Sequence, residues 1–135
     1  MQANVLNGEI VTLKVAVIED SVVLREMLCE MLDEIDDVDI CFTVDCEDDA
    51  LEKLREHTVD LAIVDLELRQ GNGLGIIRRM KADPDAFGSP KTVVFSNYAV
   101  SPMSRRCEEM GVDRIYDKSF QLHEMLDYVR ESLLS

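Results

Sequence analysis

Short runs of β-branched and apolar residues alternate five times with longer stretches of helical periodicity, and this alternation restricts the fold of the chain more than any other feature. The expected strands are Lys14–Ile18, Val38–Val44, Leu61–Val64, Thr92–Phe95 and Arg114–Asp117. Successive strand–helix units form a parallel sheet with helices on both faces, because the crossovers between parallel strands are right-handed. The sequence therefore predicts a doubly wound α/β domain with a five-stranded parallel sheet.

Residues that begin or end helices lie between these strands. Ser21 and Asp45 precede helical stretches and are the expected N-caps of the first and second helices. Pro84 follows the third stretch and ends it, because proline cannot continue helical hydrogen bonding. The fourth helix is expected to begin at Ser101-Pro102 and to end at Gly111. With 135 residues and no repeats, the chain is expected to form one domain.

The charge and the length of the apolar runs exclude several classes of protein. The formal net charge of −14 argues against direct binding to nucleic acid or to an anionic membrane, since both are polyanions. The same charge suits a basic partner surface or a bound cation, and it also suits solubility alone. The apolar runs are too short to cross a bilayer, and the first ten residues lack the basic and long apolar segments of a secretory signal. A cytoplasmic location is therefore expected.

The cysteines do not have the spacing of a zinc site. None of the four forms a Cys-x-x-Cys pair, and both histidines stand far from them in the sequence. A zinc site needs about four such ligands that converge. Free thiols in a reducing compartment are therefore expected.

Polar residues follow four of the five expected strands at their carboxyl ends. They are Glu19 and Asp20 after the first strand, Asp65 after the third, Ser96 after the fourth and Lys118 after the fifth. In open parallel sheets, ligands bind at the carboxyl ends of the strands, near the point where the strand order reverses. Each residue alone is weak evidence, because an Asp after a strand is commonly a helix cap or a turn residue. As an ordered set they predict a site.

The chemistry of these side chains indicates a phosphoryl-transfer site. Three carboxylates in a small pocket repel one another, and a bound cation or the ammonium of Lys118 relieves that repulsion. Clustered oxygen ligands suit Mg²⁺, which uses one or two carboxylates together with phosphate oxygens. The carboxylate of Asp65 is a candidate nucleophile that would form an acyl phosphate. Lys118 and the Ser96 hydroxyl are the candidate groups that would stabilise the added charge.

Four segments of the chain resemble the receiver domains of two-component response regulators. They are VIEDS (Val17–Ser21), IVDLEL…GNGL (Ile63–Leu74), VVFSN (Val93–Asn97) and GVDRIYDKS (Gly111–Ser119). The resemblance covers about residues 13 to 134, and the looser string NYA…RRCEEMGVDRIYDKSF is similar to a subgroup of stand-alone bacterial receivers. It implies a flavodoxin-like sheet with strand order 2-1-3-4-5. Residues 13–135 are accordingly expected to be the receiver domain, with residues 1–12 as an N-terminal extension.

The resemblance also implies a role for each site residue. By position, Asp65 resembles the phosphoacceptor, and Asp20 resembles the direct ligand of a Mg²⁺ or Mn²⁺ ion. Glu19 resembles the second acidic residue, which usually holds a metal-bound water, and the backbone carbonyl of Glu67 resembles a further metal ligand. The two remaining roles are the switch hydroxyl, which falls on Ser96, and the lysine that pairs with the phosphoryl group, which falls on Lys118.

Three positions depart from the pattern of the family. Ile115 stands where the family often has an aromatic switch residue, and strand alternation is expected to turn the neighbouring Tyr116 to the other face. Ser119 stands where a proline commonly follows the lysine, so a cis peptide is much less favoured there. Glu67 and Tyr98 occupy positions that tune the lifetime of the phosphoryl group in the family.

The resemblance implies partners as well. A histidine kinase or a histidine phosphotransfer protein is expected to supply the phosphoryl group, and the downstream protein is unknown. The expected partner face combines the fourth helix, the fifth strand and the fifth helix, including Arg105, Arg106, Arg114 and Asp117, and a homodimer through this face is one option. No output domain is expected after Ser135, which leaves an output switch, a phosphate relay or a phosphate sink.

Two rival functions remain open. A Mg²⁺-dependent phosphatase that passes through an aspartyl phosphate commonly has a second acid two residues after the nucleophile, and Glu67 stands there. A receiver-like binding module that is never phosphorylated is the second rival. A nucleotide- or flavin-binding domain lacks support, because GNGLG follows the third strand and matches neither a P-loop nor a dinucleotide fingerprint. The expectation is therefore a phosphoacceptor switch that catalyses only its own phosphorylation and dephosphorylation.

Overall fold

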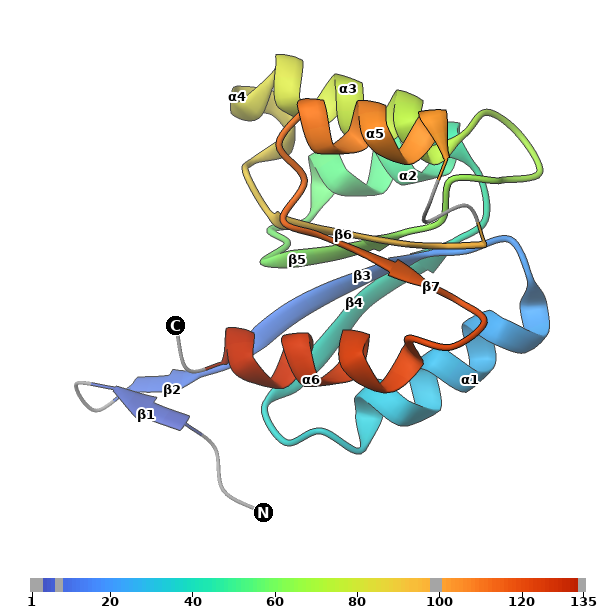
Figure 1. Ribbon diagram of the computed structural model, residues 1–135. Helices are drawn as coiled ribbons and strands as arrows, with labels where there is room; N and C mark the ends of the chain where they lie inside the picture. Colours follow the sequence, from blue (N-terminus) through green and yellow to red (C-terminus); the bar gives the residue numbers. More distant parts are fainter. Residues whose placement is uncertain (1–3, 7–8, 98–100, 134–135) are drawn as a thin grey trace.

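Five parallel strands form the centre of the protein, seen in a computed structural model that describes residues 4–6, 9–97 and 101–133 (Figure 1). The strands are β3 (Leu13–Ile18), β4 (Val38–Val44), β5 (Leu61–Val64), β6 (Lys91–Ser96) and β7 (Arg114–Asp117). They are arranged in the order β4-β3-β5-β6-β7, and every neighbouring pair is parallel. Counted along the chain, this order is 2-1-3-4-5. The predicted fold class and strand order are therefore confirmed.

Helices cover both faces of this sheet. The first and the last helix, α1 (Val22–Asp33) and α6 (Leu122–Ser132), lie on one face. The other face carries α2 (Glu47–Glu56), α3 (Gly73–Ala82), the short α4 (Pro84–Phe87) and α5 (Pro102–Glu109) (Figure 1). Among the described residues, no helix is long and apolar enough to cross a bilayer.

Each face of the sheet has its own hydrophobic core. Along β3, Val15 and Val17 pack toward α1 and α6, whereas Ala16 and Ile18 pack toward the helices of the opposite face. All four residues of β5 are buried, as expected for a central strand that is covered on both sides. The same alternation at β7 places Ile115 against the core of α2, α3 and α5 and Tyr116 against the core of α6. The expected opposite orientation of Tyr116 is confirmed.

The capping residues behave as expected, with one exception. Ser21 accepts a hydrogen bond from the Leu24 amide at the start of α1. Ser101 and Ser104 form a reciprocal capping box at the start of α5. The prediction that Asp45 caps the second helix is wrong, because the N-cap of α2 is Cys46 and has no side-chain capping bond. Asp45 instead forms an ion pair with a distant part of the chain.

A pair of short strands and one short helix go beyond the predicted alternation. The strands β1 (Asn4–Leu6) and β2 (Glu9–Val11) form an antiparallel pair apart from the main sheet, just before β3 (Figure 1). The helix α4 follows α3 directly, and the Asp83 side chain accepts a hydrogen bond from the Ala86 amide at its start. Neither element contributes to the carboxyl edge of the sheet.

Candidate functional site at the carboxyl edge of the sheet

The register of the central strands aligns the residues that follow them. Ile18 of β3 pairs with Val64 of β5, so Glu19 and Asp65 leave the sheet side by side. The Asp65 amide donates to the Ile18 carbonyl at 2.9 Å, which extends the pairing by one residue. Hydrogen bonding between neighbouring parallel strands therefore brings together two carboxylates that lie far apart in the sequence.

Lys118 joins both carboxylates from the far side of β6. Its Nζ atom lies 2.7 Å from Glu19 Oε1 and 2.9 Å from Asp65 Oδ2. Both carboxylates are almost fully buried, with 2% of Glu19 and 3% of Asp65 exposed. Charged side chains of this kind are rarely buried unless they are paired. The ammonium of Lys118 is thus the cation that makes this burial tolerable.

Backbone amides fix the orientation of the two carboxylates, and Arg25 holds the main chain of Glu19. The second oxygen of Glu19, Oε2, accepts a hydrogen bond from the Ser21 amide at 3.0 Å. The second oxygen of Asp65, Oδ1, accepts one from the Glu67 amide at 3.2 Å. Arg25 of α1 donates to the Glu19 carbonyl at 2.8 Å. Each of the four carboxylate oxygens therefore has a partner, which holds the two side chains in one arrangement.

Asp20 completes a group of three carboxylates that could hold a metal ion. One oxygen each from Glu19, Asp20 and Asp65 lies within 4.8 Å of the others, and Asp20 is the most open of the three. When fully ionised, the set would carry three negative charges against the single positive charge of Lys118. Clustered carboxylate oxygens with one open member fit Mg²⁺, which keeps several of its waters.

Burial changes the pKa values of Asp65 and Lys118 in opposite directions. Burial raises the pKa of Asp65 to about 7, with the Lys118 bond lowering it and the Glu19 charge raising it. For Lys118, burial lowers the pKa, but the bonds to Glu19 and Asp65 outweigh burial and raise it above its usual value. A further cation at this edge would favour the ionised form of Asp65.

The other sequence-predicted residues lie at the same edge. Ser96 ends β6, is fully buried, and its carbonyl accepts a hydrogen bond from the Lys118 amide at 3.1 Å. Glu67 has an exposed side chain and contributes its amide to Asp65. Tyr98 lies outside the described residues. The structure therefore brings Glu19, Asp20, Asp65 and Lys118 together, with Ser96 and the Glu67 backbone beside them.

The loop after Lys118 turns without a cis peptide bond. No peptide bond among the described residues is cis. The Ser119 amide donates to the Asp117 side chain at 2.7 Å, and the Gln121 amide donates to the Asp117 carbonyl at 2.9 Å. These two bonds form the turn that leads into α6.

Gly73 and Arg25 support the site but were not identified from the sequence. A side chain at Gly73 would collide with the Asp65 carbonyl oxygen, so the start of α3 can approach Asp65 only with glycine there. The GNGL segment carried a local signal for the glycine. Arg25 had no such signal, because its contact with Glu19 depends on the packing of α1 beside β3.

Comparison with known proteins gives a family and a set of related folds. The model of the response regulator receiver domain family matches residues 15–130. A protein-glutamate methylesterase/protein-glutamine glutaminase 1 of Methanospirillum hungatei JF-1 is 33% identical over 103 residues, which cover 75% of this chain and 29% of that protein. The response regulator GacA of Pseudomonas aeruginosa is 27% identical over 120 residues, which cover 88% of this chain and 54% of GacA. The chain thus spans about a third to a half of the length of these two relatives.

Solved structures agree with the fold. The response regulator domain of Thermotoga maritima CheB superimposes with a TM-score of 0.79 at 18% identity and covers 92% of this chain and 98% of that chain. The receiver domain of the putative regulator NarL from Mycobacterium tuberculosis gives a TM-score of 0.80 at 17% identity, covering 93% of this chain and 98% of that chain.

Proposed function

The chain belongs to the response regulator receiver domain family, whose members act in two-component signalling, and on that premise we propose that it accepts a phosphoryl group on Asp65. In this reaction an oxygen of the Asp65 carboxylate attacks the phosphorus atom of a donor. A new oxygen–phosphorus bond forms, the bond between phosphorus and the leaving group breaks, and an aspartyl phosphate results. The donor we propose is a phosphohistidine on a histidine kinase or a histidine phosphotransfer protein.

The observation that carries this proposal is the ammonium of Lys118 between two buried carboxylates. Lys118 Nζ lies 2.9 Å from Asp65 Oδ2, where it favours the ionised and therefore nucleophilic form of that carboxylate. After transfer, the same ammonium is in reach of a phosphoryl group on Asp65. We assign the Ser96 hydroxyl a second hydrogen bond to that group.

Four residues are the proposed ligands of a Mg²⁺ or Mn²⁺ ion. They are Asp20 and Asp65 directly, Glu19 through water, and Glu67 through its backbone carbonyl. The ion would neutralise the carboxylates and the phosphoryl oxygens during transfer. The proximity of one oxygen each from Glu19, Asp20 and Asp65 supports this assignment.

The output we propose is a change in the surface formed by α5, β7 and α6. Arg105, Arg106 and Arg114 are exposed on these elements. Lys118 directly follows β7, so a movement of Lys118 toward a phosphoryl group would bias the packing of this surface. Phosphorylation shifts such an equilibrium only if it favours one packing over the other. An unidentified downstream protein, or a second copy of the chain, would then bind one packing more tightly.

We further propose that residues 13–135 are the receiver unit, that residues 1–12 extend it, and that the protein acts in the cytoplasm. We propose no reaction beyond its own phosphorylation and dephosphorylation. No contact of the described residues favours the phosphatase alternative, and Glu67 directs only its amide to Asp65.

Incubation with Mg²⁺ and acetyl phosphate, followed by intact mass measurement, tests the proposal. A Mg²⁺-dependent gain of one phosphoryl group that is absent in Asp65→Asn is the expected result. If the phosphorylated form decays before its mass is measured, binding of beryllofluoride, a stable mimic of the aspartyl phosphate, tests the same site. Failure of both reagents would leave the non-phosphorylated binding module as the better explanation.

A further inference from the structure

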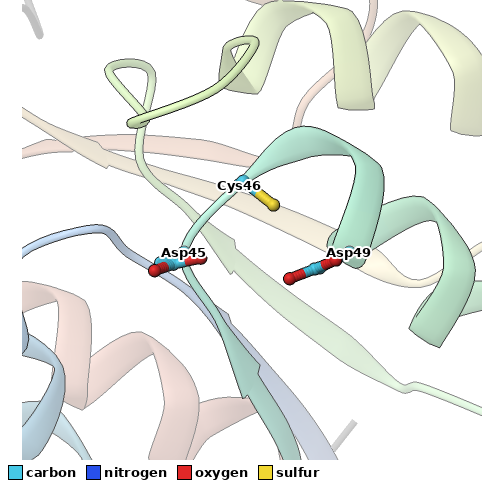
Figure 2. Close-up of side chains that lie close together, drawn as sticks. All are labelled: Asp45, Cys46 and Asp49. Carbon is cyan, nitrogen blue, oxygen red and sulfur yellow. The ribbon is translucent and has the colours of Figure 1, made fainter.

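A second charged cluster lies where the loop after Asp65 meets the start of α2. Figure 2 shows Asp45, Cys46 and Asp49 at this place, and their ligand atoms lie within 4.8 Å of one another. Arg69 already provides a cation there. Its Nε lies 2.8 Å from Asp45 Oδ2, and its Nη2 lies 3.9 Å from Asp49 Oδ2 and 3.6 Å from Cys46 Sγ. The cluster is therefore an internal ion pair between two segments and gives no reason to invoke a metal ion.

Hydrogen bonds next to this ion pair join the same two segments. The Glu47 amide donates to the Gln70 carbonyl at 3.0 Å, and the Asp48 amide donates to Gln70 Oε1 at 3.0 Å. In the other direction, Glu47 Oε1 accepts from the Asn72 amide at 3.0 Å. The first turn of α2, whose amides have no partner within the helix, is thus bonded to the loop that follows Asp65.

Two glycines make room for the Glu47 side chain. A Cβ atom at Gly71 would collide with Glu47 Cβ, and one at Gly75 would lie 2.6 Å from Glu47 Oε1. Gly71 also has a φ of 70°, which side chains rarely adopt. The loop therefore lacks side chains at the places where the Glu47 carboxylate enters it. This fit indicates a tight and specific junction.

Glu67 links the junction to Asp65. Glu67 forms an antiparallel bridge with Asn72, which Glu47 holds. On its other side, the Glu67 amide holds Asp65 Oδ1 at 3.2 Å. The position of the Glu67 carbonyl, a proposed metal ligand, thus depends on the loop that Glu47 and Arg69 tie to α2.

We propose that Glu47 and Arg69 are positioning residues that hold the Glu67 carbonyl in place for Mg²⁺ and thereby raise the affinity of the site for the ion. This inference rests on the proposed function. Residues that orient metal ligands commonly contribute about tenfold or more to affinity. Glu47→Ala leaves the Asn72 amide without this acceptor and is expected to raise the Mg²⁺ dissociation constant about tenfold. Arg69→Met is expected to raise it about threefold, because the Arg69 side chain is 57% exposed and its ion pair is correspondingly weak.

Isothermal titration of the metal-free full chain with Mg²⁺ tests the inference. Glu47→Gln and Arg69→Lys are the conservative variants, and both are expected to bind Mg²⁺ more tightly than Glu47→Ala and Arg69→Met. In Glu47→Gln the side-chain amide oxygen can still accept from the Asn72 amide. If Glu47→Ala does not fold, Arg69→Met tests the inference, because it breaks the ion pair to Asp45 and keeps the Glu47 side chain. Arg130→Met removes an ion pair with Asp127 on α6, far along the chain from the loop, and is expected to bind Mg²⁺ as the wild type does.

The rate of phosphorylation by acetyl phosphate separates positioning from general damage. At saturating Mg²⁺ the phosphorylation rates of Glu47→Ala and Arg69→Met are expected to return to within about twofold of the wild-type rate. This difference is small compared with the roughly tenfold effect of losing a residue that orients a metal ligand. Folded variants that bind Mg²⁺ with wild-type affinity would overturn the inference while leaving the proposed function intact. A wild type that neither binds Mg²⁺ nor gains a phosphoryl group would overturn both.

Discussion

The two edges of the sheet use carboxylates in different ways. At the carboxyl edge, Glu19 and Asp65 are buried and face one another across Lys118. At the amino edge, Asp60 and Asp113 are exposed and serve the backbone: Asp60 Oδ2 accepts from the Lys14 amide at 2.8 Å, and Asp113 Oδ2 accepts from the Thr92 amide at 2.7 Å. The amino-edge carboxylates thus stabilise the beginnings of strands, whereas at the carboxyl edge the charge of Glu19 raises the pKa of Asp65.

The shapes of the two edges would suggest the reverse assignment of function. A cavity of about 650 Å³ lies at the amino edge and is lined by Leu13, His57, Asp60 and Phe87 among others. Among the described residues, however, the two buried charged side chains are Glu19 and Asp65, and both lie at the carboxyl edge. Burying a charge is costly, so a fold keeps one only where it is compensated. In this protein, buried charged side chains therefore indicate the functional site better than cavity volume does.

The largest effect is expected when the ammonium of Lys118 is removed from between the two buried carboxylates. Lys118→Met leaves Glu19 and Asp65 buried without their shared partner, and we expect a loss of about 3 kcal/mol in the free energy of unfolding. Urea denaturation at pH 8 without Mg²⁺ measures it, and added Mg²⁺ is expected to restore part of the loss. An unchanged urea midpoint would mean that the ion pairs of Lys118 do not stabilise the buried carboxylates of Glu19 and Asp65.

The pH dependence of stability tests the buried state of Asp65. Because the folded pKa of about 7 lies above the ordinary value of 3.8, the folded state binds the proton more tightly. The resulting stability is fully present below about pH 3.8 and is lost as the pH rises through about 7. Between pH 5 and pH 8, the metal-free wild type is expected to lose about 2 kcal/mol relative to Asp65→Asn. If the free energy of unfolding changed with pH in the same way in the wild type and in Asp65→Asn, the raised pKa of Asp65 would be contradicted.

Mg²⁺ sharpens the comparison because it is expected to act at one edge only. At ten times its dissociation constant, it should stabilise the wild type by about 1.4 kcal/mol. Asp20→Asn should lose most of this gain, whereas Asp85→Asn, which changes an exposed acid lining the amino-edge cavity, should keep it. Thermal unfolding with and without Mg²⁺ compares the three proteins. Equal loss in both variants would point to nonspecific binding of the ion to the acidic surface.

The smallest effect is expected at the amino edge. Asp60→Ala removes the acceptor for the Lys14 amide and should cost about 1 kcal/mol of stability. Its affinity for Mg²⁺, measured by isothermal titration, should match that of the wild type. A weakened Mg²⁺ site in this variant would show that the two edges are coupled.

The beryllofluoride state offers a further comparison, between the site and the surface of α5, β7 and α6. Amide hydrogen exchange in β7 and at the start of α6 is expected to change by about twofold or more on addition of Mg²⁺ and beryllofluoride, as for an element with two packings. The same experiment on Asp65→Asn is the control. Exchange that changes only in the loops around Asp65 would argue against this surface as the output.

Much of the fold and of the site could be predicted because both depend on local patterns. The strand pattern predicts the parallel sheet, and the sheet then brings Glu19, Asp65 and Lys118 to one edge. Strand alternation also predicted the direction of Tyr116, which packs beside Tyr128 of α6 with the ring centroids 6.4 Å apart. In these cases the alternation of side chains along a strand and the alignment of parallel strands were sufficient for the prediction.

Contacts between distant segments could not be predicted in this way. Asp45 had the sequence signal of a helix cap, but it pairs with Arg69, which is 24 residues away in the numbering of the chain. The fit of Glu47 beside Gly71 likewise depends on how α2 packs against the loop after β5. By contrast, the β1–β2 pair had a usable signal, since an Asn-Gly dipeptide flanked by apolar residues is typical of a hairpin.

The buried carboxylate of Asp65 is the group that we propose accepts the phosphoryl group. Borohydride reduction of the phosphorylated protein converts an aspartyl phosphate to homoserine, and peptide mass mapping then locates the modified residue. Homoserine is expected at position 65 and nowhere else. Homoserine at Asp20 or Asp45, or phosphorylation that leaves no reducible aspartate, would contradict it.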